Sequence, residues 1–284
     1  MKEIKTLAVL NTVFFLLHLV PSQLTQLELF NGQTIGDVSD KYPALFTPAG
    51  LTFSIWGVIY LALSAFCIYH LVKAFKVPSQ HQANVDLQRL GYLFMANNLA
   101  TGAWTIAWVN EWLVLSVVLI LIQLATLLAM HVRLGIYTAG RSVASKWFTQ
   151  VPLSLYFGWI IIATVANISS ALVGLEWDRF GLSEGLWTTI MLVVAALLVG
   201  YVVLARTNPV VGLVGIWAFY GIILKHHTLN LEESRQIIIT AWGCLAVVAL
   251  VVLIVFFRNY KTEESRQQAE AFLSTWQMLM AYSV

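Results

Sequence analysis

The stretch PAGLTFSIWGVIYLALSAFCIYHLV, from Pro48 to Val72, decides the fold of this chain. It contains no Asp, Glu, Lys or Arg. A bilayer core about 30 Å thick requires about 20 apolar residues of helix, because lipid offers no hydrogen-bond partner to free backbone N–H and C=O groups. The stretch therefore predicts a helix that crosses a membrane.

The composition of the whole chain points the same way. Of the 284 residues, 59% are hydrophobic and only 11% are charged, and the mean hydropathy is +0.78. Soluble domains carry about 25% charged residues. The 16 Lys and Arg residues are too few and too scattered for a nucleic-acid partner, and two cysteines are too few for a disulfide framework. The expected surroundings are the lipid bilayer.

Eight charge-free stretches predict an all-α, polytopic membrane bundle of about eight transmembrane helices. Eight crossings place both termini on one side of the membrane. If that side is the cytoplasm, 12 of the 16 Lys and Arg residues fall inside, as the positive-inside rule requires. We expect a bacterial inner membrane, because no targeting extension precedes the first span, although an organelle membrane would suit the same helices. The predicted spans are 6–22, 48–72, 90–109, 113–132, 148–173, 185–205, 209–224 and 236–257.

Two segments outside the spans have a character of their own. Residues 23–47 are expected to form a long outer loop, with turn signals such as Asn31-Gly32. In 262–281, apolar residues at helical spacing follow a charged stretch, which predicts an amphipathic helix on the inner membrane surface. A partner-binding or disordered tail is the alternative for this segment.

Several kinds of chemistry lack the residues that they need. Ion-coupled transport uses charges inside the membrane, and no predicted span has one. The sequence has no Ser-His-Asp grouping, no glycine-rich phosphate loop and no HExxH motif, so we do not expect an enzyme. His226-His227 is expected in an outer loop, where neighbouring positions rarely bind one metal. Cys67 and Cys244 lie at different depths, so no disulfide between them is predicted. No metal or cofactor is predicted either.

Tryptophan is the positive signal, with 11 residues. An aromatic belt at the membrane interface accounts for those near span ends. It does not account for Trp159, which lies near the middle of the fifth span, or for Trp56 and Trp104, which are inset from the ends of theirs. Amides inside the spans, among them Asn98 and Asn167, need partners from other helices or from a ligand.

These residues lie at similar depths. Trp159, Ala163 and Asn167 form one i, i+4, i+8 row in the fifth span, and the small Ala163 leaves a gap beside the indole. Trp56 and Tyr60 lie in the outer third to middle of the second span. Aromatic faces with a few amides and no charge suit a flat, largely apolar ligand. Simple packing between helices explains the same residues equally well.

Two motifs resemble the TspO/MBR family of tryptophan-rich sensory or translocator proteins. PAGLTFSIWGVIY keeps the family spacing from Pro48 to Trp56 and Tyr60, and WIIIATVAN keeps the spacing from Trp159 to Asn167. A weaker match is LATGAWTIAW, where Thr101 stands in place of the Asn of Asn-x-x-Trp.

The resemblance covers about 1–175, the five spans of the whole family fold. Thr47 stands in place of the first proline of the family's Pro-Pro pair, and Leu45 replaces an aromatic residue. The proline before the fifth-span tryptophan is displaced by one turn, to Pro152. The expected organisation is a five-helix core with an outer lid loop (1–175), three additional spans (176–258) and a cytoplasmic amphipathic tail (259–284).

The resemblance implies a membrane receptor that binds porphyrins, other tetrapyrroles or sterol-like molecules under a lid at 31–47. A homodimer is expected by family analogy alone. A transporter of such molecules is the main alternative, although the inner halves of the spans are almost wholly aliphatic. An enzyme that oxidises a bound porphyrin and a structural partner of another membrane complex are two further hypotheses. By position, the ligand-binding residues would be Trp56, Tyr60, Asn98, Trp104, Trp159, Ala163 and Asn167, with Pro48 and Phe53 in the lid.

Overall fold

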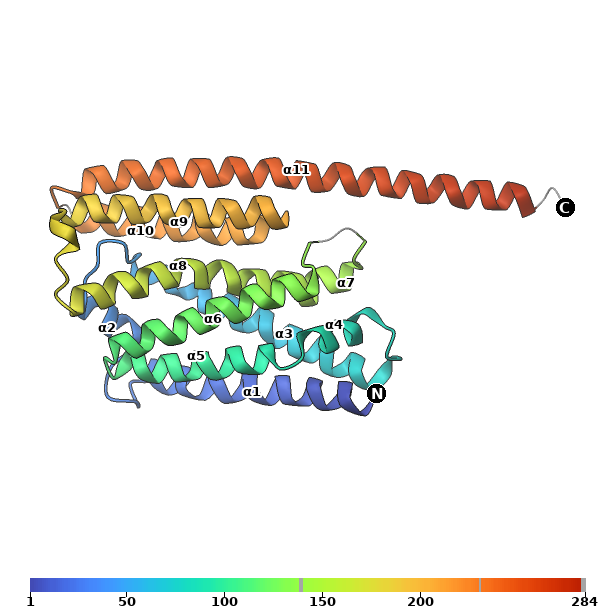
Figure 1. Cartoon of the computed structure of the whole chain (residues 1–284), viewed down its shortest axis with the longest axis horizontal. Helices are drawn as coiled ribbons and strands as arrows, with labels where there is room; N and C mark the ends of the chain where they lie inside the picture. Colours follow the sequence, from blue (N-terminus) through green and yellow to red (C-terminus); the bar gives the residue numbers. More distant parts are fainter. Residues whose placement is uncertain (138–139, 230, 282–284) are drawn as a thin grey trace.

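The computed structural model describes residues 1–137, 140–229 and 231–281, and within these ranges the protein is helical without any strand. The helices run side by side along the molecule (Figure 1). The short helices α2, η1, α4, α7, η2 and η3 lie between the long ones. The elements are α1 Lys2–Gln26, α2 Ile35–Lys41, η1 Gly50–Ser54, α3 Ile55–Lys76, α4 Gln82–Leu90, α5 Leu93–Val109, α6 Leu113–Leu134, α7 Val143–Ser145, η2 Lys146–Gln150, α8 Val151–Gly174, η3 Arg179–Gly181, α9 Glu184–Arg206, α10 Pro209–Leu229 and α11 Ser234–Ala281.

The prediction of a polytopic helical bundle is confirmed. Among the described residues, seven helices are long and apolar enough to cross a membrane. The remaining predicted span, 90–109, corresponds to α5, whose 17 residues are at the lower limit for a crossing. The start of α1 and the end of α11 point to the same end of the bundle (Figure 1), as an even number of crossings requires.

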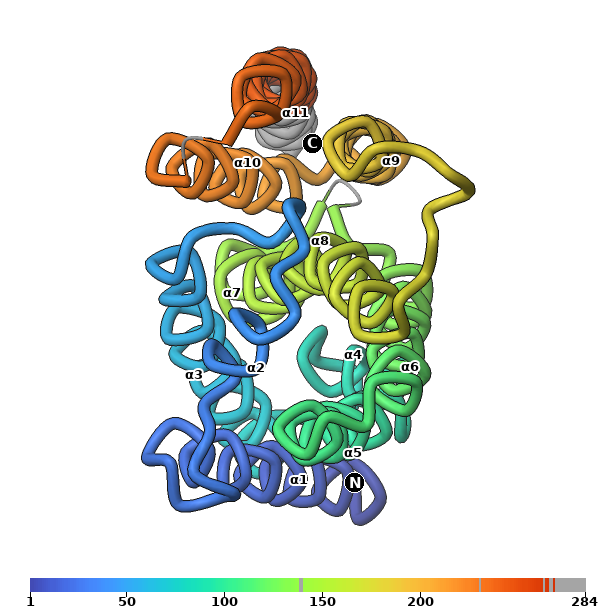
Figure 2. Tube along the Cα trace, turned by 90° about the vertical axis from the view of Figure 1, so that its left-hand side faces the viewer, coloured from blue at the N-terminus to red at the C-terminus, as the bar shows by residue number. Residues whose placement is uncertain are grey.

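Two layers meet at α8. Viewed along the helices, α1, α3, α5, α6 and α8 surround a centre, and α9, α10 and α11 pack on the other side of α8 (Figure 2). In keeping with this position, 72% of the apolar window of α8 is buried, against 33% for α6. Gly158 allows the backbones of α8 and α10 to approach, because a Cβ there would lie 3.2 Å from the Cα of Val211. The two layers are therefore in direct backbone contact.

The prediction of a loop over 23–47 is wrong in part. Helix α1 continues through Pro21 to Gln26, and α2 forms within the expected loop. A reciprocal cap begins α2: the Thr34 hydroxyl accepts from the Asp37 amide, and the Asp37 carboxylate accepts from the Thr34 amide at 2.8 Å. Hydrogen bonds to the Asp37 carboxylate from the Thr34 amide, and then from the Thr34 hydroxyl, hold its pKa below the usual value. Short-range capping thus orders a segment that turn signals alone do not.

Two further predictions need correction near the C-terminal spans. Helix α10 runs to Leu229, so His226 and His227 lie in its last turn and not in a loop. The backbone over 262–281 is helical, but it continues α11 without a break instead of forming a separate helix. The side chains from 269 onward lie outside the described residues, and the placement of this segment on the membrane surface stays a prediction.

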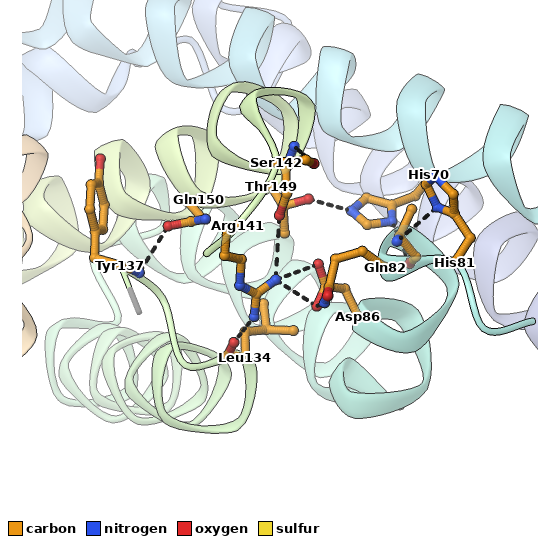
Figure 3. A network of polar contacts seen from close by, with 12 residues as sticks. His70, His81, Gln82, Asp86, Leu134, Tyr137, Arg141, Ser142, Thr149 and Gln150 are labelled. Atoms are coloured by element: carbon orange, nitrogen blue, oxygen red, sulfur yellow. Dashed lines mark hydrogen bonds and ion pairs between the residues drawn. The ribbon is translucent and has the colours of Figure 1, made fainter. Parts of the chain in front are cut away.

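A buried ion pair joins two connections (Figure 3) that lie at the end of the bundle carrying the N-terminus (Figure 1). The Arg141 guanidinium donates to both carboxylate oxygens of Asp86, at 2.8 and 2.7 Å, and to the Leu134 carbonyl. Gln82 donates to the same carboxylate at 2.9 Å. Both charged side chains are almost fully buried, at 6% and 0% exposure. The pair joins α4 to the connection between α6 and α7.

Asp86→Ala is expected to lower the free energy of unfolding by about 3–5 kcal/mol, because it leaves the Arg141 guanidinium buried without a counter-charge. Thermal unfolding followed by circular dichroism in detergent measures the loss. Lys41→Ala is the control, because the Lys41–Glu111 pair is exposed on its lysine side and should matter far less. Equal losses in the two variants would contradict the account of the buried pair.

Candidate functional site

A cavity lies at the end of the bundle opposite to the termini, enclosed by α2, α3, α5, α6 and α8. The empty space is about 570 Å³, with its open mouth included. Its lining is aromatic and apolar with a few neutral polar groups, and none of the described lining residues is ionisable. Seven of the nine residues that the sequence predicts for the ligand or the lid line this cavity, namely Pro48, Phe53, Trp56, Trp104, Trp159, Ala163 and Asn167.

Tyr60 and Asn98 do not line the cavity. The Tyr60 hydroxyl lies 3.3 Å from the hydroxyl of Ser22 on α1, and its ring lies edge-on to His18. Asn98 is buried and donates to the Phe94 carbonyl of its own helix at 2.7 Å. Both side chains serve the packing of the bundle in this structure.

Aromatic rings form the cavity walls. Trp159 stands at the centre: the ring centroids of Trp56 and Phe53 lie 6.3 and 5.8 Å away, each nearly perpendicular to its indole. On the opposite helix, Trp104 and Trp108 are stacked, with 6.0 Å between their centroids. Four indoles from α3, α5 and α8 therefore converge on one space, and helical periodicity places each of them there.

A family model for TSPO-like proteins matches residues 8–255. The chain belongs to the TSPO-like family. The match includes α9, α10 and much of α11, whereas the motif resemblance ends near residue 175. Neither curated proteins nor solved structures give a significant match.

In this TSPO-like protein, the amide of Asn167 joins three helices. Its oxygen accepts from the Trp104 indole at 2.9 Å, and its nitrogen donates to the Ser116 hydroxyl of α6 at 2.9 Å. An amide in lipid needs such partners, because water is absent there. Asn167 therefore fixes the orientation of the Trp104 ring in the cavity wall.

Helix α2 falls within the predicted lid at 31–47, but no individual cavity residue is predicted in α2 or in α6. Ile35 and Ser39 of α2 line the cavity, and the Ile35 carbonyl accepts from the Trp108 indole at 3.1 Å. From α6, Ile120 and Gln123 line it. One signal for Gln123 was available, because it is the only amide in the predicted span 113–132. The predicted lid covers α2, but which of its side chains line the cavity depends on how the chain folds back over the bundle.

Helix α10 holds the segment that closes one side of the cavity. The Ala49 amide donates to the Gly221 carbonyl at 3.0 Å, and the Trp217 indole donates to the Thr52 carbonyl at 3.0 Å. His226 lies 2.8 Å from the Leu45 carbonyl through Nε2. A Cβ at Gly221 would overlap the side chain of Thr52, so glycine is required for this approach. The C-terminal layer thus supports the segment 44–54.

A second contact fastens α2 to the outer end of α5. The Glu111 carboxylate accepts from the Lys41 ammonium at 2.6 Å and from the Tyr42 hydroxyl at 2.6 Å. Hydrogen bonds from Lys41, and then from Tyr42, hold the pKa of Glu111 below its ordinary value. The same partner raises the pKa of Lys41 and of Tyr42. The C-terminal end of α2 is therefore held by the contacts with Glu111, and the segment 44–54 is held by α10.

The contact of Glu111 with Lys41 and Tyr42 is expected to weaken at low pH. Because the folded pKa of Glu111 is lowered, its stabilisation is complete above the ordinary value of 4.5 and is lost as the pH falls through the lowered pKa. Glu111→Gln should lower the melting temperature at pH 7, and the difference from wild type should shrink as the pH falls below 4.5. A difference that persists unchanged at about pH 3 would contradict this role for Glu111.

His226→Leu is expected to loosen the segment 44–54, because it leaves the Leu45 carbonyl without its partner in α10. Amide hydrogen exchange of Ala49 should become faster by about tenfold, the effect of losing one buried hydrogen bond. Exposed His227 next to it provides the matched control variant, His227→Leu. Unchanged exchange at Ala49 in His226→Leu would show that α10 does not hold this segment.

Proposed function

We propose that this TSPO-like protein is a membrane receptor for a flat, largely apolar molecule, either a porphyrin or related tetrapyrrole or a sterol-like compound. The observation that carries the proposal is the group of four indoles around a cavity whose described lining residues are all non-ionisable. Indole faces offer a large apolar contact area and favourable stacking geometry for a conjugated ring. Ligand sites are typically concave and mostly apolar with a few placed polar groups, and this cavity fits that description.

We infer a way of entry from the contacts around the cavity. Trp56 and Trp159 are arranged edge to face, so a flat molecule that stacks on one indole would have to displace the ring of the other. Ala163 follows Trp159 by one helical turn and lines the cavity, so its small side chain leaves space beside the indole. Entry past α2 and the segment 44–54 would require opening the Lys41–Glu111 contact and the hydrogen bonds between this segment and α10.

The proposed orientation places the cavity on the outer side of the membrane and both termini in the cytoplasm. The positive-inside count supports it, and so does the position of the cavity at the end opposite to the termini. Proteolysis of a C-terminal tag in right-side-out and inverted vesicles tests this orientation. Cleavage of the tag in right-side-out vesicles would contradict it.

Transport of the same ligand is a second candidate, and one observation favours it. Buried polar groups continue below the cavity: the Tyr156 hydroxyl lies 2.6 Å from that of Thr101 and 3.3 Å from the Gln123 amide oxygen, and Asn97 follows at 3.1 Å from the Gln123 carbonyl. These polar side chains are exceptions to the expectation that the inner halves are almost wholly aliphatic. Ligand flux in proteoliposomes, compared with empty vesicles, separates a transporter from a receptor.

The receptor proposal predicts saturable quenching of tryptophan fluorescence by protoporphyrin in the detergent-purified protein, at micromolar concentration. Trp56→Phe/Trp159→Phe should weaken the apparent affinity by tenfold or more, or about 1.4 kcal/mol, because two contacting indoles are lost. The matched control is Trp112→Phe/Trp147→Phe, which removes two exposed indoles outside the cavity. Identical, unsaturable quenching in all three proteins would show that the cavity indoles only pack.

A further inference from the structure

A second pocket lies at the same end of the bundle as the tryptophan-lined cavity, where α8 connects to α9 (Figure 1). Residues 44–46, the last turns of α8, the connection that contains η3 and the first two turns of α9 enclose it. The empty space is about 320 Å³, with its open mouth included. No described residue lines both this pocket and the cavity, so the two are separate sites.

Two opposite charges line the second pocket, Arg179 of the connection and Glu184 of α9. Both side chains are half-buried, and neither forms an ion pair with the other or with any other described residue. The Arg179 Nε donates to the Leu182 carbonyl at 3.4 Å, which leaves its two Nη atoms without a partner among the described residues. The charges of Lys225 and Asp40 act on each other nearby, and Glu184 acts on the same ammonium.

Aromatic rings form another part of the lining. Trp177 and Trp187 both line the pocket, with 4.9 Å between their ring centroids and 71° between their planes. Two indoles at this angle make a corner of aromatic surface, and Glu184 lies in the helical turn that carries Trp187. Aromatic faces attract ammonium and quaternary ammonium groups, and a carboxylate beside them adds a full opposite charge. This part of the pocket therefore suits a cation.

The other charge of the pocket suits an anion of a particular shape. A guanidinium with free N–H groups matches the oxygens of a phosphate, because its planar fork can donate two parallel hydrogen bonds. A ligand with a phosphate alone would face the Glu184 carboxylate, and a ligand with an ammonium alone would face Arg179. A ligand that carries both groups satisfies both side chains. The lining therefore favours a zwitterion with a phosphate and an ammonium group.

The surroundings of the pocket favour a lipid as the source of that zwitterion. Helix α8 ends at Gly174 and α9 begins at Glu184, so the pocket lies where two membrane spans end and head groups are expected. Exposed apolar side chains flank the lining residues in the chain: Leu175 is 56% exposed, Phe180 is 80% exposed and Leu186 is 41% exposed. Apolar surface at this level would contact the lipid that carries the head group.

We propose that this pocket binds the head group of a zwitterionic phospholipid from the leaflet at this end of the bundle. Arg179 would bind the phosphate, and Glu184 with Trp177 and Trp187 would bind the ammonium group. The proposal does not depend on what the tryptophan-lined cavity binds. Because residues 44–46 form one side of the pocket, the bound lipid would also contact the segment 44–54 that α10 holds.

Native mass spectrometry of the delipidated protein in detergent tests the proposal. The protein is mixed with equal amounts of dioleoyl phosphatidylethanolamine and dioleoyl phosphatidylglycerol, which have the same chains, and the ratio of the two bound lipids is measured. Arg179→Gln and Glu184→Gln each remove one charge of the pocket. Arg235→Gln and Glu176→Gln are the matched controls, because both residues are exposed and neither lines the pocket.

The two pocket variants should change binding in different ways. Wild type should retain more phosphatidylethanolamine than phosphatidylglycerol. Glu184→Gln should lower that ratio about fivefold, the upper end of the effect of a partly exposed ion pair, because only the ammonium group loses its partner. Arg179→Gln should weaken both lipids without lowering the ratio, because both carry a phosphate. The two control variants should keep the wild-type ratio.

A folding defect is separated from a binding defect by a conservative variant. Glu184→Asp keeps the charge and should keep a ratio within about twofold of wild type. Thermal unfolding followed by circular dichroism should give the same melting temperature for all of these variants as for wild type. A loss of both lipids in Glu184→Gln together with a lower melting temperature would move the test to Arg179→Gln and Glu184→Asp.

Three results would overturn the proposal. A wild-type ratio in correctly folded Glu184→Gln would show that this carboxylate does not bind the ammonium group. Undiminished binding of both lipids by Arg179→Gln would show that the guanidinium does not bind the phosphate. Displacement of phosphatidylethanolamine by soluble glycerophosphoethanolamine at millimolar concentration would show that the ligand is a soluble zwitterion and not a lipid. None of these results bears on the receptor proposal, because its ligand site is the separate cavity.

Discussion

The constraint on which this structure depends is that polar groups inside the bilayer have only each other as partners. Lipid offers no hydrogen bonds, so the amides, hydroxyls and indoles of the spans must pair across helices. Asn167 illustrates the result: one amide links α8 to Trp104 on α5 and to Ser116 on α6. At the end of the bundle that carries the N-terminus, the buried Asp86–Arg141 ion pair joins α4 to the connection between α6 and α7.

The same constraint makes the exceptions informative. Trp159 and Gln123 are as deeply buried as the paired residues, yet the indole nitrogen of Trp159 and the amide nitrogen of Gln123 have no hydrogen-bond partner among the described residues. The α9–α11 layer takes part in the same way, because α10 supplies hydrogen bonds to the backbone of the segment 44–54. This segment lines the cavity, so the α9–α11 layer supports one of the cavity walls.

Much of this was predictable from the sequence, for physical reasons that also set the limit. Charge-free stretches define the spans, and helical periodicity with the Pro48–Trp56 and Trp159–Asn167 spacings brings the main indoles to one depth. The sequence did not predict features that depend on contacts between residues far apart in the chain. The contact of Trp217 with Thr52 joins residues 165 positions apart, and that of His226 with Leu45 joins residues 181 apart. Tyr60 follows Trp56 by one helical turn, yet its hydroxyl lies against Ser22 of α1 instead of in the cavity wall, a contact that the sequence does not reveal.

The central claim is that a flat ligand lies among the four cavity indoles. Incorporation of 5-fluorotryptophan, with each resonance assigned by single Trp→Phe substitutions, allows every indole to be followed by ¹⁹F NMR during titration with protoporphyrin. The account predicts saturable shifts or broadening for Trp56, Trp104, Trp108 and Trp159, with Trp112 and Trp147 unchanged. Equal changes at the exposed tryptophans, or none at the cavity indoles, would contradict it.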